Sequence, residues 1–328
     1  MKTRLLLVAA ILATALMPVS ASAEPALTVG VAYDIGGRGD RSFNDASHAG
    51  LEKAQKQFDF ELVPVVTDGS SADREKRIRS LIAKNCDPII AIGSGYSPTL
   101  QALAVEYPST HFAIINDASV AALNVTSVIF ADNQGAFLAG FSAAQLSKSG
   151  KVAMIANPDQ ADIYKDGFAA GVAAAKRKVI PIVKYVSGSY SAATSQVLDA
   201  GADVVFAATQ GSNSEIFKVI VARNAKKKGS NIGLINIEPD QYITVTSATK
   251  KFLFASVVKR VDKAIYDVIT LSAAKRQYLD ILDADAGIYG RRYGITGGGI
   301  EFTIRSKELA ALSDSINVAA ATAEKILA

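Results

Sequence analysis

A short segment near the start of the sequence combines the residue types that bind a small polar ligand. The apolar run Leu27–Ala32 ends before Asp34, and a glycine-rich turn leads into Asp40–Asn44 and a helical pattern. Open α/β sheets build their ligand crevice where a buried strand ends before a helix. Carboxylates and amides bind hydroxyl and N–H groups, and the ring of Phe43 can stack on a flat ligand. We therefore expect a crevice lined by Asp34, Ser42, Phe43 and Asn44. The alternatives are that Phe43 packs at the helix start and that Ser42 only caps the helix.

The glycines of this turn do not have the spacing of a phosphate-binding loop. They fall at 36, 37 and 39, which does not match GxGxxG, and the sequence contains no GxxxxGK[ST]. We therefore expect no phosphate-bearing cofactor. The glycines are better interpreted as positions of positive φ in a tight turn.

The sequence lacks the residue patterns of the common catalytic and metal sites. It contains no HExxH, CxxC or GxSxG, and its single cysteine, Cys86, has no histidine beside it. Acidic residues such as Asp34 and Asp40 could transfer protons, but nothing in the pattern separates that role from ligand binding. We therefore expect a binding protein with no catalytic residue, no metal and no cofactor.

The rest of the sequence alternates short apolar runs with helical periodicity. Runs such as PIIAIG and GADVVFAA are apolar throughout, which is typical of parallel strands covered by helices on both faces. Alternation of this length indicates βαβ units, and hence an α/β fold with doubly wound parallel sheets. The expected strands are 27–33, 60–66, 88–92, 110–116, 125–130, 151–155, 179–186, 203–208, 231–237, 254–258 and a short one at 301–304.

The two halves of the sequence share one pattern and predict two similar lobes. LTVGVAYD opens the first half and GKVAMIAN the second, and CDPIIAIGSG resembles GADVVFAATQG. In a two-lobed α/β protein the ligand site lies between the carboxyl ends of the strands. Phe206 could then supply a second ring opposite Phe43. Lys259, at a strand-to-helix junction, could donate to a hydroxyl, or it could be an exposed helix lysine.

We expect the chain to cross between the lobes three times, near residues 131, 239 and 284. Lobe I is then 27–130 plus 240–283, and lobe II is 131–239 plus 284–328. The pattern weakens after about Ser272, and we interpret this region as the connection back to lobe II.

Residues 1–23 have the pattern of a secretory signal peptide. Lys2 and Arg4 precede the apolar stretch Leu5–Met17, and Ala21–Ala23 offers a cleavage site of small residues. No cysteine lies near this site to accept a lipid. We expect an exported protein, in the periplasm or on the outer face of the cell membrane, with an uncleaved anchor as the alternative. Without Lys2 and Arg4, 35 − 2 = 33 basic residues face 31 acidic ones, a balance that does not favour nucleic acid as a partner.

The sequence contains a series of further motifs: DIGG (34–37), DRSFN (40–44), FAII (112–115), GAFLAG (135–140), GADVVF (201–206), PDQ (239–241) and SVVKRVD (256–262). In their order and spacing, these motifs resemble the basic membrane protein family, also called PnrA-like, whose members are substrate-binding proteins of ABC importers. The resemblance covers about residues 27 to 304 and implies a type I periplasmic-binding-protein fold with a nucleoside between the two lobes. It also implies ABC permease subunits in the membrane as partners.

The resemblance also implies roles for individual residues. Phe43 and Phe206 match the two rings that stack on the base, and Asp34 and Asn44 match polar groups near it. Asn116 falls where many members have Asp, a role that Asp117 takes if the alignment shifts by one. The residues matched to the ribose are Gly211, Glu238 and Lys259, and Asp240 completes the expected ligand-binding set.

Three segments depart from the family pattern and leave the exact ligand open. Glu238 stands where many members have Asp, Gln210–Asn213 replaces a glycine-rich GGTG, and Ala156–Asp162 lacks a glycine–methionine pattern. We expect a monomeric receptor that closes at a hinge around a nucleoside with a purine base. The alternatives are a receptor for another small polar solute, such as a sugar or a signalling furanose, and an exported nucleoside-processing enzyme.

Overall fold

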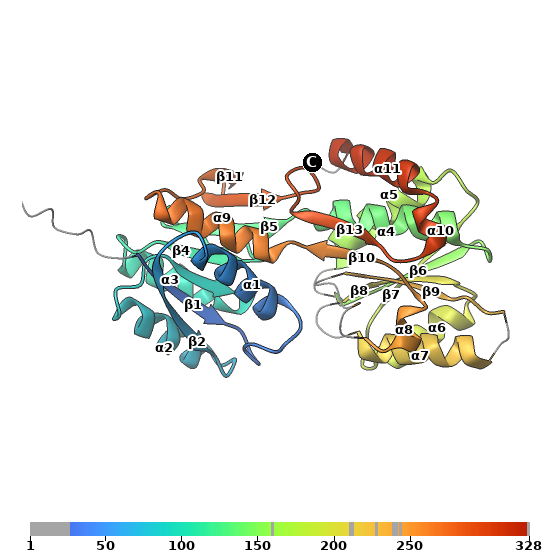
Figure 1. Cartoon of the computed structure of the whole chain (residues 1–328), viewed down its shortest axis with the longest axis horizontal. Coiled ribbons are helices and arrows are strands. Elements are labelled where there is room, and N and C mark those ends of the chain that lie inside the picture. Colours follow the sequence, from blue (N-terminus) through green and yellow to red (C-terminus); the bar gives the residue numbers. More distant parts are fainter. Residues whose placement is uncertain are drawn as a thin grey trace, which may run out of the picture.

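The chain folds into two α/β lobes that lie end to end (Figure 1). The computed structural model describes residues 27–158, 161–209, 213–226, 229–237, 242 and 245–326. Each lobe has one mostly parallel sheet with helices on both faces, so the predicted fold class, the type I periplasmic-binding-protein fold, is confirmed. The predicted signal peptide, residues 1–23, lies outside the described residues. Among the helices that are described, none is long and apolar enough to cross a bilayer.

Lobe I is built on a seven-stranded sheet with the order β11-β12-β5-β4-β3-β1-β2. Helices α1 and α9 pack on one face, and α2 and α3 pack on the other. The strands are β1 (Leu27–Tyr33), β2 (Phe60–Val66), β3 (Ile89–Ile92), β4 (Phe112–Ile115), β5 (Val125–Phe130), β11 (Asp280–Asp283) and β12 (Ile288–Tyr293). The helices are α1 (Phe43–Gln55), α2 (Ser71–Ile82), the 3₁₀ turn η1 (Ser94–Tyr96), α3 (Ser97–Glu106) and α9 (Val261–Ala273).

Lobe II is built on a six-stranded sheet with the order β13-β10-β9-β8-β6-β7. Helices α4, α5, α10 and α11 cover one face, and α6 and α7 cover the other. The strands are β6 (Lys151–Ala156), β7 (Ile180–Tyr185), β8 (Val204–Ala208), β9 (Gly233–Ile237), β10 (Leu253–Lys259) and β13 (Ile300–Ile304). The helices are α4 (Asp132–Leu146), α5 (Ala161–Ala174), α6 (Tyr190–Asp199), α7 (Ser214–Lys226), α8 (Ser247–Lys250), α10 (Lys307–Ala310) and α11 (Ser313–Ile326).

The two sheets repeat one strand order, which confirms the prediction of two similar lobes. The order β5-β4-β3-β1-β2 in lobe I corresponds to β10-β9-β8-β6-β7 in lobe II. Strands β1 and β6 are therefore counterparts, as are the helices that follow them, α1 and α5. This correspondence places the start of α1 and the start of α5 at equivalent positions in the two lobes.

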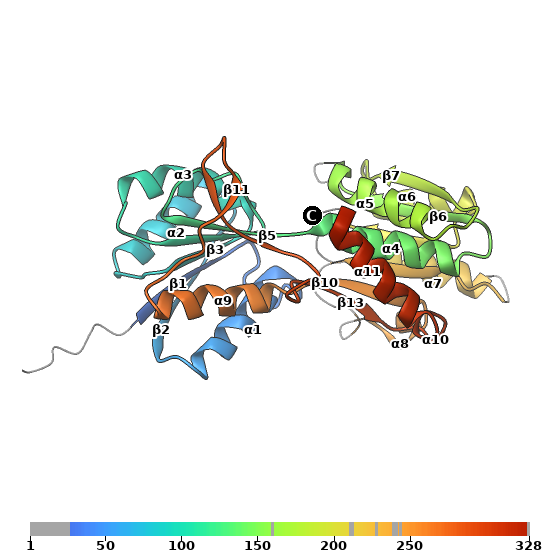
Figure 2. The same cartoon turned by 90° about the horizontal axis from the view of Figure 1, so that it is seen from above.

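The chain crosses between the lobes after β5, after β10 and after β12 (Figure 2). The first crossing, at Ala131, is the predicted one. The other two predicted positions are wrong, because β10 pairs with β9 and β13 in lobe II, whereas β12 pairs with β5 in lobe I. The crossings lie side by side and are joined by backbone hydrogen bonds. Ala131 N donates to Tyr293 O at 2.9 Å, and Arg260 N donates to Gly299 O at 2.9 Å.

Candidate functional site

The side chain of Lys259 is the centre of a polar cluster at the crossing between the lobes. Lys259 ends β10 and is 2 % exposed, so the alternative of an exposed helix lysine is wrong. Its Nζ donates to Asp132 Oδ2 at 2.9 Å, to the Tyr164 hydroxyl at 3.1 Å and to Asn116 Oδ1 at 3.4 Å. A buried ammonium group needs such partners to offset its lost hydration. The cluster therefore holds a cation in place at the crossing between the lobes.

The partners of Lys259 come from both lobes. Asn116 follows β4 of lobe I in the left-handed conformation (φ 66°), which asparagine tolerates better than most residues. Asp132 is the first residue of α4, directly after the first crossing. The neighbouring Asp117 is engaged elsewhere, because its Oδ1 accepts from the Ser119 backbone N–H and hydroxyl. Of the two alternatives that the alignment left open, Asn116 is the residue that contacts Lys259.

Two aromatic rings flank the Lys259 ammonium group. The ring centroid of Phe43 lies 5.6 Å from Nζ and that of Tyr164 lies 5.7 Å away. Phe43 is the first residue of α1 in lobe I, and Tyr164 is in the first turn of α5 in lobe II. The sequence analysis did not identify Tyr164. The similarity of the two halves could have identified Tyr164, because in each lobe an aromatic residue lies at the start of the helix that follows the first strand.

Phe206 does not face the cleft in this structure. It is 0 % exposed, and all five residues of β8 are buried. Its ring stacks on Phe168, with centroids 5.8 Å apart, and meets the ring of Tyr164 edge-on at 6.5 Å. The expected sandwich of Phe43 and Phe206 is therefore absent here, because α5 covers the ring of Phe206. Stacking of Phe206 on a ligand stays a prediction that requires this packing to change.

Asp34 is fixed at the end of β1 by hydrogen bonds to its backbone and its carboxylate. Asn44 Oδ1 accepts from Asp34 N at 3.0 Å, and Asn44 Nδ2 donates to Asp34 O at 3.4 Å. Arg74 Nη2 donates to Asp34 Oδ1 at 2.8 Å. The side chain of Asp34 is 37 % exposed, whereas Asn44 is 2 % exposed. Asn44 thus positions Asp34, and its own contact with a ligand stays a prediction.

The turn between β1 and α1 has the backbone that its glycines predicted. Gly36, Gly37 and Gly39 all have positive φ, at 87°, 57° and 95°. Ser42 occupies the position before α1, but its side chain does not cap the helix. Asp40 does so instead, because its carboxylate accepts from the backbone N–H groups of Ser42, Asn44 and Asp45. The first helical turn, and with it Phe43, is therefore held by a carboxylate.

The substitution Asp40→Ala should lower the free energy of unfolding by about 1 kcal/mol, the usual effect of losing a helix cap. The measurement is urea denaturation followed by circular dichroism. Asp59→Ala is the matched control, because Asp59 is exposed in the loop before β2. Equal stability of the two variants would contradict a capping role for Asp40.

A cavity of about 620 Å³ opens between the lobes beside the turn that precedes α1. Its lobe I wall is Gly39–Arg41, and its lobe II wall is formed by α7 and by Val245, Thr246 and Thr249. A volume of this size is within the range of small-molecule sites. This cavity is therefore wide enough to admit a solute, although the residues of the Lys259 cluster do not line it.

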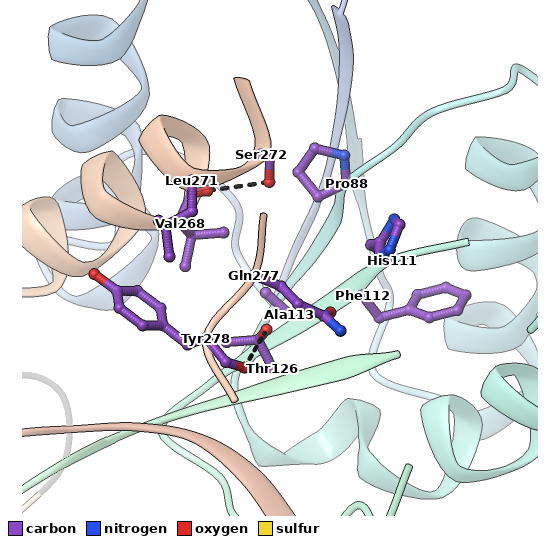
Figure 3. A pocket seen from close by; sticks show the side chains of 10 residues that line it. All are labelled: Pro88, His111, Phe112, Ala113, Thr126, Val268, Leu271, Ser272, Gln277 and Tyr278. Atoms are coloured by element: carbon purple, nitrogen blue, oxygen red, sulfur yellow. Dashed lines mark hydrogen bonds between the residues drawn. The ribbon is translucent and has the colours of Figure 1, made fainter. Parts of the chain in front are cut away.

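A second cavity lies at the opposite ends of the lobe I strands and does not suit a solute. Figure 3 shows it between Pro88, His111 and Phe112, at the amino ends of β3 and β4, and residues of α9. Its volume is about 10 Å³, enough for about one water molecule. The Thr126 hydroxyl donates to Tyr278 O across it at 3.4 Å.

The remaining expected site residues, Gly211, Glu238 and Asp240, lie outside the described residues. Among the residues that are described, no group of three or more His, Cys, Asp or Glu side chains could hold a metal ion. The described site therefore offers hydrogen-bonding groups and aromatic rings for a ligand.

Residues 27–326 match the model of a protein family described as "ABC transporter substrate-binding protein PnrA-like". This chain belongs to the PnrA-like family. A "CD4+ T-cell-stimulating antigen" of Listeria innocua is 31% identical over 75% of this chain and 74% of its own. The "ABC transporter nucleoside-binding protein BmpA" of Lactococcus lactis is 26% identical over 74% of each chain. As a PnrA-like protein, the chain belongs to a family of substrate-binding proteins rather than enzymes.

Solved structures share the fold of this PnrA-like chain at low sequence identity. A "Transcriptional Activator of comK gene" from Bacillus halodurans has a TM-score of 0.71 at 20% identity, covering 90% of this chain and 97% of its own. An ABC transporter solute-binding protein from Aeropyrum pernix K1 has a TM-score of 0.67 at 21% identity, covering 91% and 86%. At these identities the likeness supports the fold alone. For the PnrA-like family, a small-molecule ligand and a permease partner follow from its membership among ABC transporter substrate-binding proteins.

Proposed function

We propose that this protein is an exported, monomeric receptor that binds a nucleoside between its lobes and delivers it to an ABC permease. The observation that carries the proposal is the buried cluster of Lys259, Asp132 and Asn116 beside the ring of Phe43. Ribose hydroxyls both donate and accept hydrogen bonds, which matches an ammonium donor beside carboxylate and amide acceptors. The cluster therefore suits the sugar of a nucleoside, and the ring beside it suits the base.

One oxygen of Asp132 supports a ligand with hydroxyl groups. Asp132 Oδ1 is buried and accepts no hydrogen bond from the described residues, whereas Oδ2 accepts from Lys259 and Tyr164. A buried acceptor without a donor is costly, and a donor from a ligand would remove that cost. A sugar hydroxyl beside Lys259 could supply this donor.

The position of Phe43 supports a flat base next to that sugar. Its ring lies 5.6 Å from the Lys259 ammonium group, so a sugar bound at this cluster would place its base near the ring. Stacking of a base on an aromatic side chain contributes about 1–3 kcal/mol. The Lactococcus lactis relative named as nucleoside-binding agrees with this ligand class.

Ligand binding would favour closure of the lobes because the cluster includes groups from both. Asn116 belongs to lobe I, and Lys259, Asp132 and Tyr164 belong to lobe II. A ligand shifts an open–closed equilibrium only by its difference in affinity for the two states. A nucleoside that contacts both lobes has such a difference, and the closed form would then dock on the permease.

Calorimetry with guanosine, inosine, adenosine, cytidine and free ribose tests the proposal. We expect purine nucleosides to bind more tightly than cytidine, and cytidine more tightly than ribose, because stacking adds to the sugar contacts. Absence of nucleoside binding by folded protein would contradict it.

A receptor for a sugar without a base is the second candidate. The buried position of Phe206 favours it, because only one of the two expected stacking rings lies near the cluster in this structure. Tight binding of sugars, with nucleosides inert, would select this candidate. Conversion of a bound nucleoside to product on long incubation would instead indicate an enzyme.

A further inference from the structure

Two residues at equivalent positions join the lobes, and both have the same backbone conformation. Ala131 lies between β5 and α4, and Arg260 lies between β10 and α9. Their dihedral angles are φ −79°, ψ 69° and φ −81°, ψ 63°, close to those of an inverse γ-turn. Hinges between domains are commonly a few residues at the ends of elements, which absorb the change in φ and ψ. Rotation of one lobe against the other must therefore change the backbone at Ala131 and Arg260, the hinge residues.

The third crossing is a closed turn that is bonded to both hinge residues. It runs from the end of β12 to the start of β13 through Gly294–Gly299 (Figure 2). Gly299 N donates to Gly294 O at 2.8 Å, which closes the turn on itself. At one end of the turn, Ala131 N donates to Tyr293 O. At the other end, Arg260 N donates to Gly299 O, so the turn links the two hinge residues.

The side chain of Gln134 adds a contact between this turn and α4. Gln134 is in the first turn of α4 and is 6 % exposed. Its Oε1 accepts from Ile295 N at 3.0 Å. Space for this oxygen depends on Gly294, because a Cβ atom there would lie 2.8 Å from Oε1. Gln134 therefore fastens the third crossing to lobe II by a side-chain bond, in addition to the backbone bonds.

We propose that Gln134 is a positioning residue that makes the crossings turn as one unit and thereby limits how far the lobes open. With Gln134 bonded to Ile295, the turn moves with α4, so rotation is concentrated at the hinge residues and the end of β12. Asp132, the partner of Lys259, lies in the same helical turn as Gln134. Fixing this helical turn also fixes the carboxylate of the cluster. The inference goes beyond the proposed ligand, because it applies to any solute that contacts both lobes.

The experiment measures the distance between the lobes by pulsed electron spin resonance, without added nucleoside. Lys76→Cys on α2 and Gln196→Cys on α6 carry the spin labels, because both positions are exposed. The native Cys86 is 2 % exposed, so it stays unlabelled. We expect Gln134→Met to add longer distances that the unaltered protein does not populate. Gln134→Glu keeps an acceptor oxygen for Ile295 N and should restore the original distribution.

The matched control is Gln145→Met, at the other end of the same helix. Gln145 Nε2 donates to Ala175 O at 3.4 Å, far along α4 from the crossings. This variant should keep the distances of the unaltered protein. Guanosine affinity, measured by calorimetry, should fall severalfold in Gln134→Met and stay unchanged in Gln145→Met. The reason is that the apparent Kd rises as the fraction of protein in the binding-competent conformation falls.

The outcomes separate this inference from the proposed function. Equal distance distributions in Gln134→Met and Gln145→Met would overturn the inference, since a merely structural role lowers stability without moving the lobes. Failure of Gln134→Glu to restore the distribution would overturn it as well. If Gln134→Met does not fold, Gly294→Ala gives the decision, because its Cβ displaces the same oxygen and should add the same longer distances. Absence of guanosine binding by the unaltered protein would overturn the proposed function and leave the distance result standing.

Discussion

Replacing Lys259 with methionine should lower the free energy of unfolding by about 3–5 kcal/mol, the usual effect of removing one partner of a buried ion pair. The Lys259 side chain is 1 % exposed and that of Asp132 is 15 % exposed, so the remaining carboxylate would be largely buried without its cation. The Tyr164 hydroxyl and Asn116 Oδ1 would lose a donor as well. Nucleoside binding should also be lost, because the cluster that is proposed to bind the sugar would lose its central cation. Urea denaturation and calorimetry measure the two effects.

The control for Lys259→Met is the same exchange at Lys263, in the first turn of α9. Lys263 pairs with Asp267 four residues along the helix, and its side chain is 34 % exposed. A pair of this kind contributes at most about 1 kcal/mol. Equal stability of the two variants, together with unchanged nucleoside affinity of Lys259→Met, would contradict the central place of Lys259.

The strands of the core could be predicted from the sequence because burial on both faces leaves continuous apolar runs. Strands β1, β2 and β5 have the predicted bounds. Strands β11 and β12 were not predicted, because their sequences, DILD and IYGRRY, contain charged residues. Asp280 and Asp283 are exposed on an edge strand, where charged residues are common.

The positions of the crossings could not be predicted, because an apolar run does not show which sheet it joins. Strand β10 (LFASVVK) is compatible with either lobe, and only its pairing with β9 and β13 assigns it to lobe II. This assignment has a functional consequence. It places Lys259 directly at a crossing, where its side chain reaches Asp132 and Asn116.

Site residues were predicted where strand ends and turns mark them, and missed where the fold brings distant segments together. Phe43 and Lys259 were identified from their positions at junctions between elements. Asp132 also lies at a junction, the first crossing, but neither Asp132 nor Arg74 was identified, because the sequence does not show which partner the fold brings to them over 127 and 40 residues. Phe206 was predicted to line the cleft because it ends the apolar run GADVVF. In the structure its ring is buried in the core, where it stacks on Phe168.

The substitution Phe43→Ala should weaken nucleoside binding by about 1–3 kcal/mol, or roughly 5- to 150-fold in Kd, because the base loses its stacking partner. Ribose binding should change little, since the hydrogen-bonding groups around Lys259 remain. Calorimetry with guanosine and with ribose measures both effects.

Two further variants at this position distinguish stacking from packing. Phe43→Leu keeps an apolar side chain but removes the ring, so a stacking role predicts an affinity close to that of Phe43→Ala. Phe43→Tyr keeps the ring and should bind nucleosides nearly as well as the unaltered protein. Phe43 is partly buried against the core that also contains Leu51 and Ile265, so each variant also needs its unfolding free energy measured. If Phe43→Leu binds guanosine as tightly as the unaltered protein does, Phe43 packs at the start of α1 and the base is bound elsewhere in the cleft.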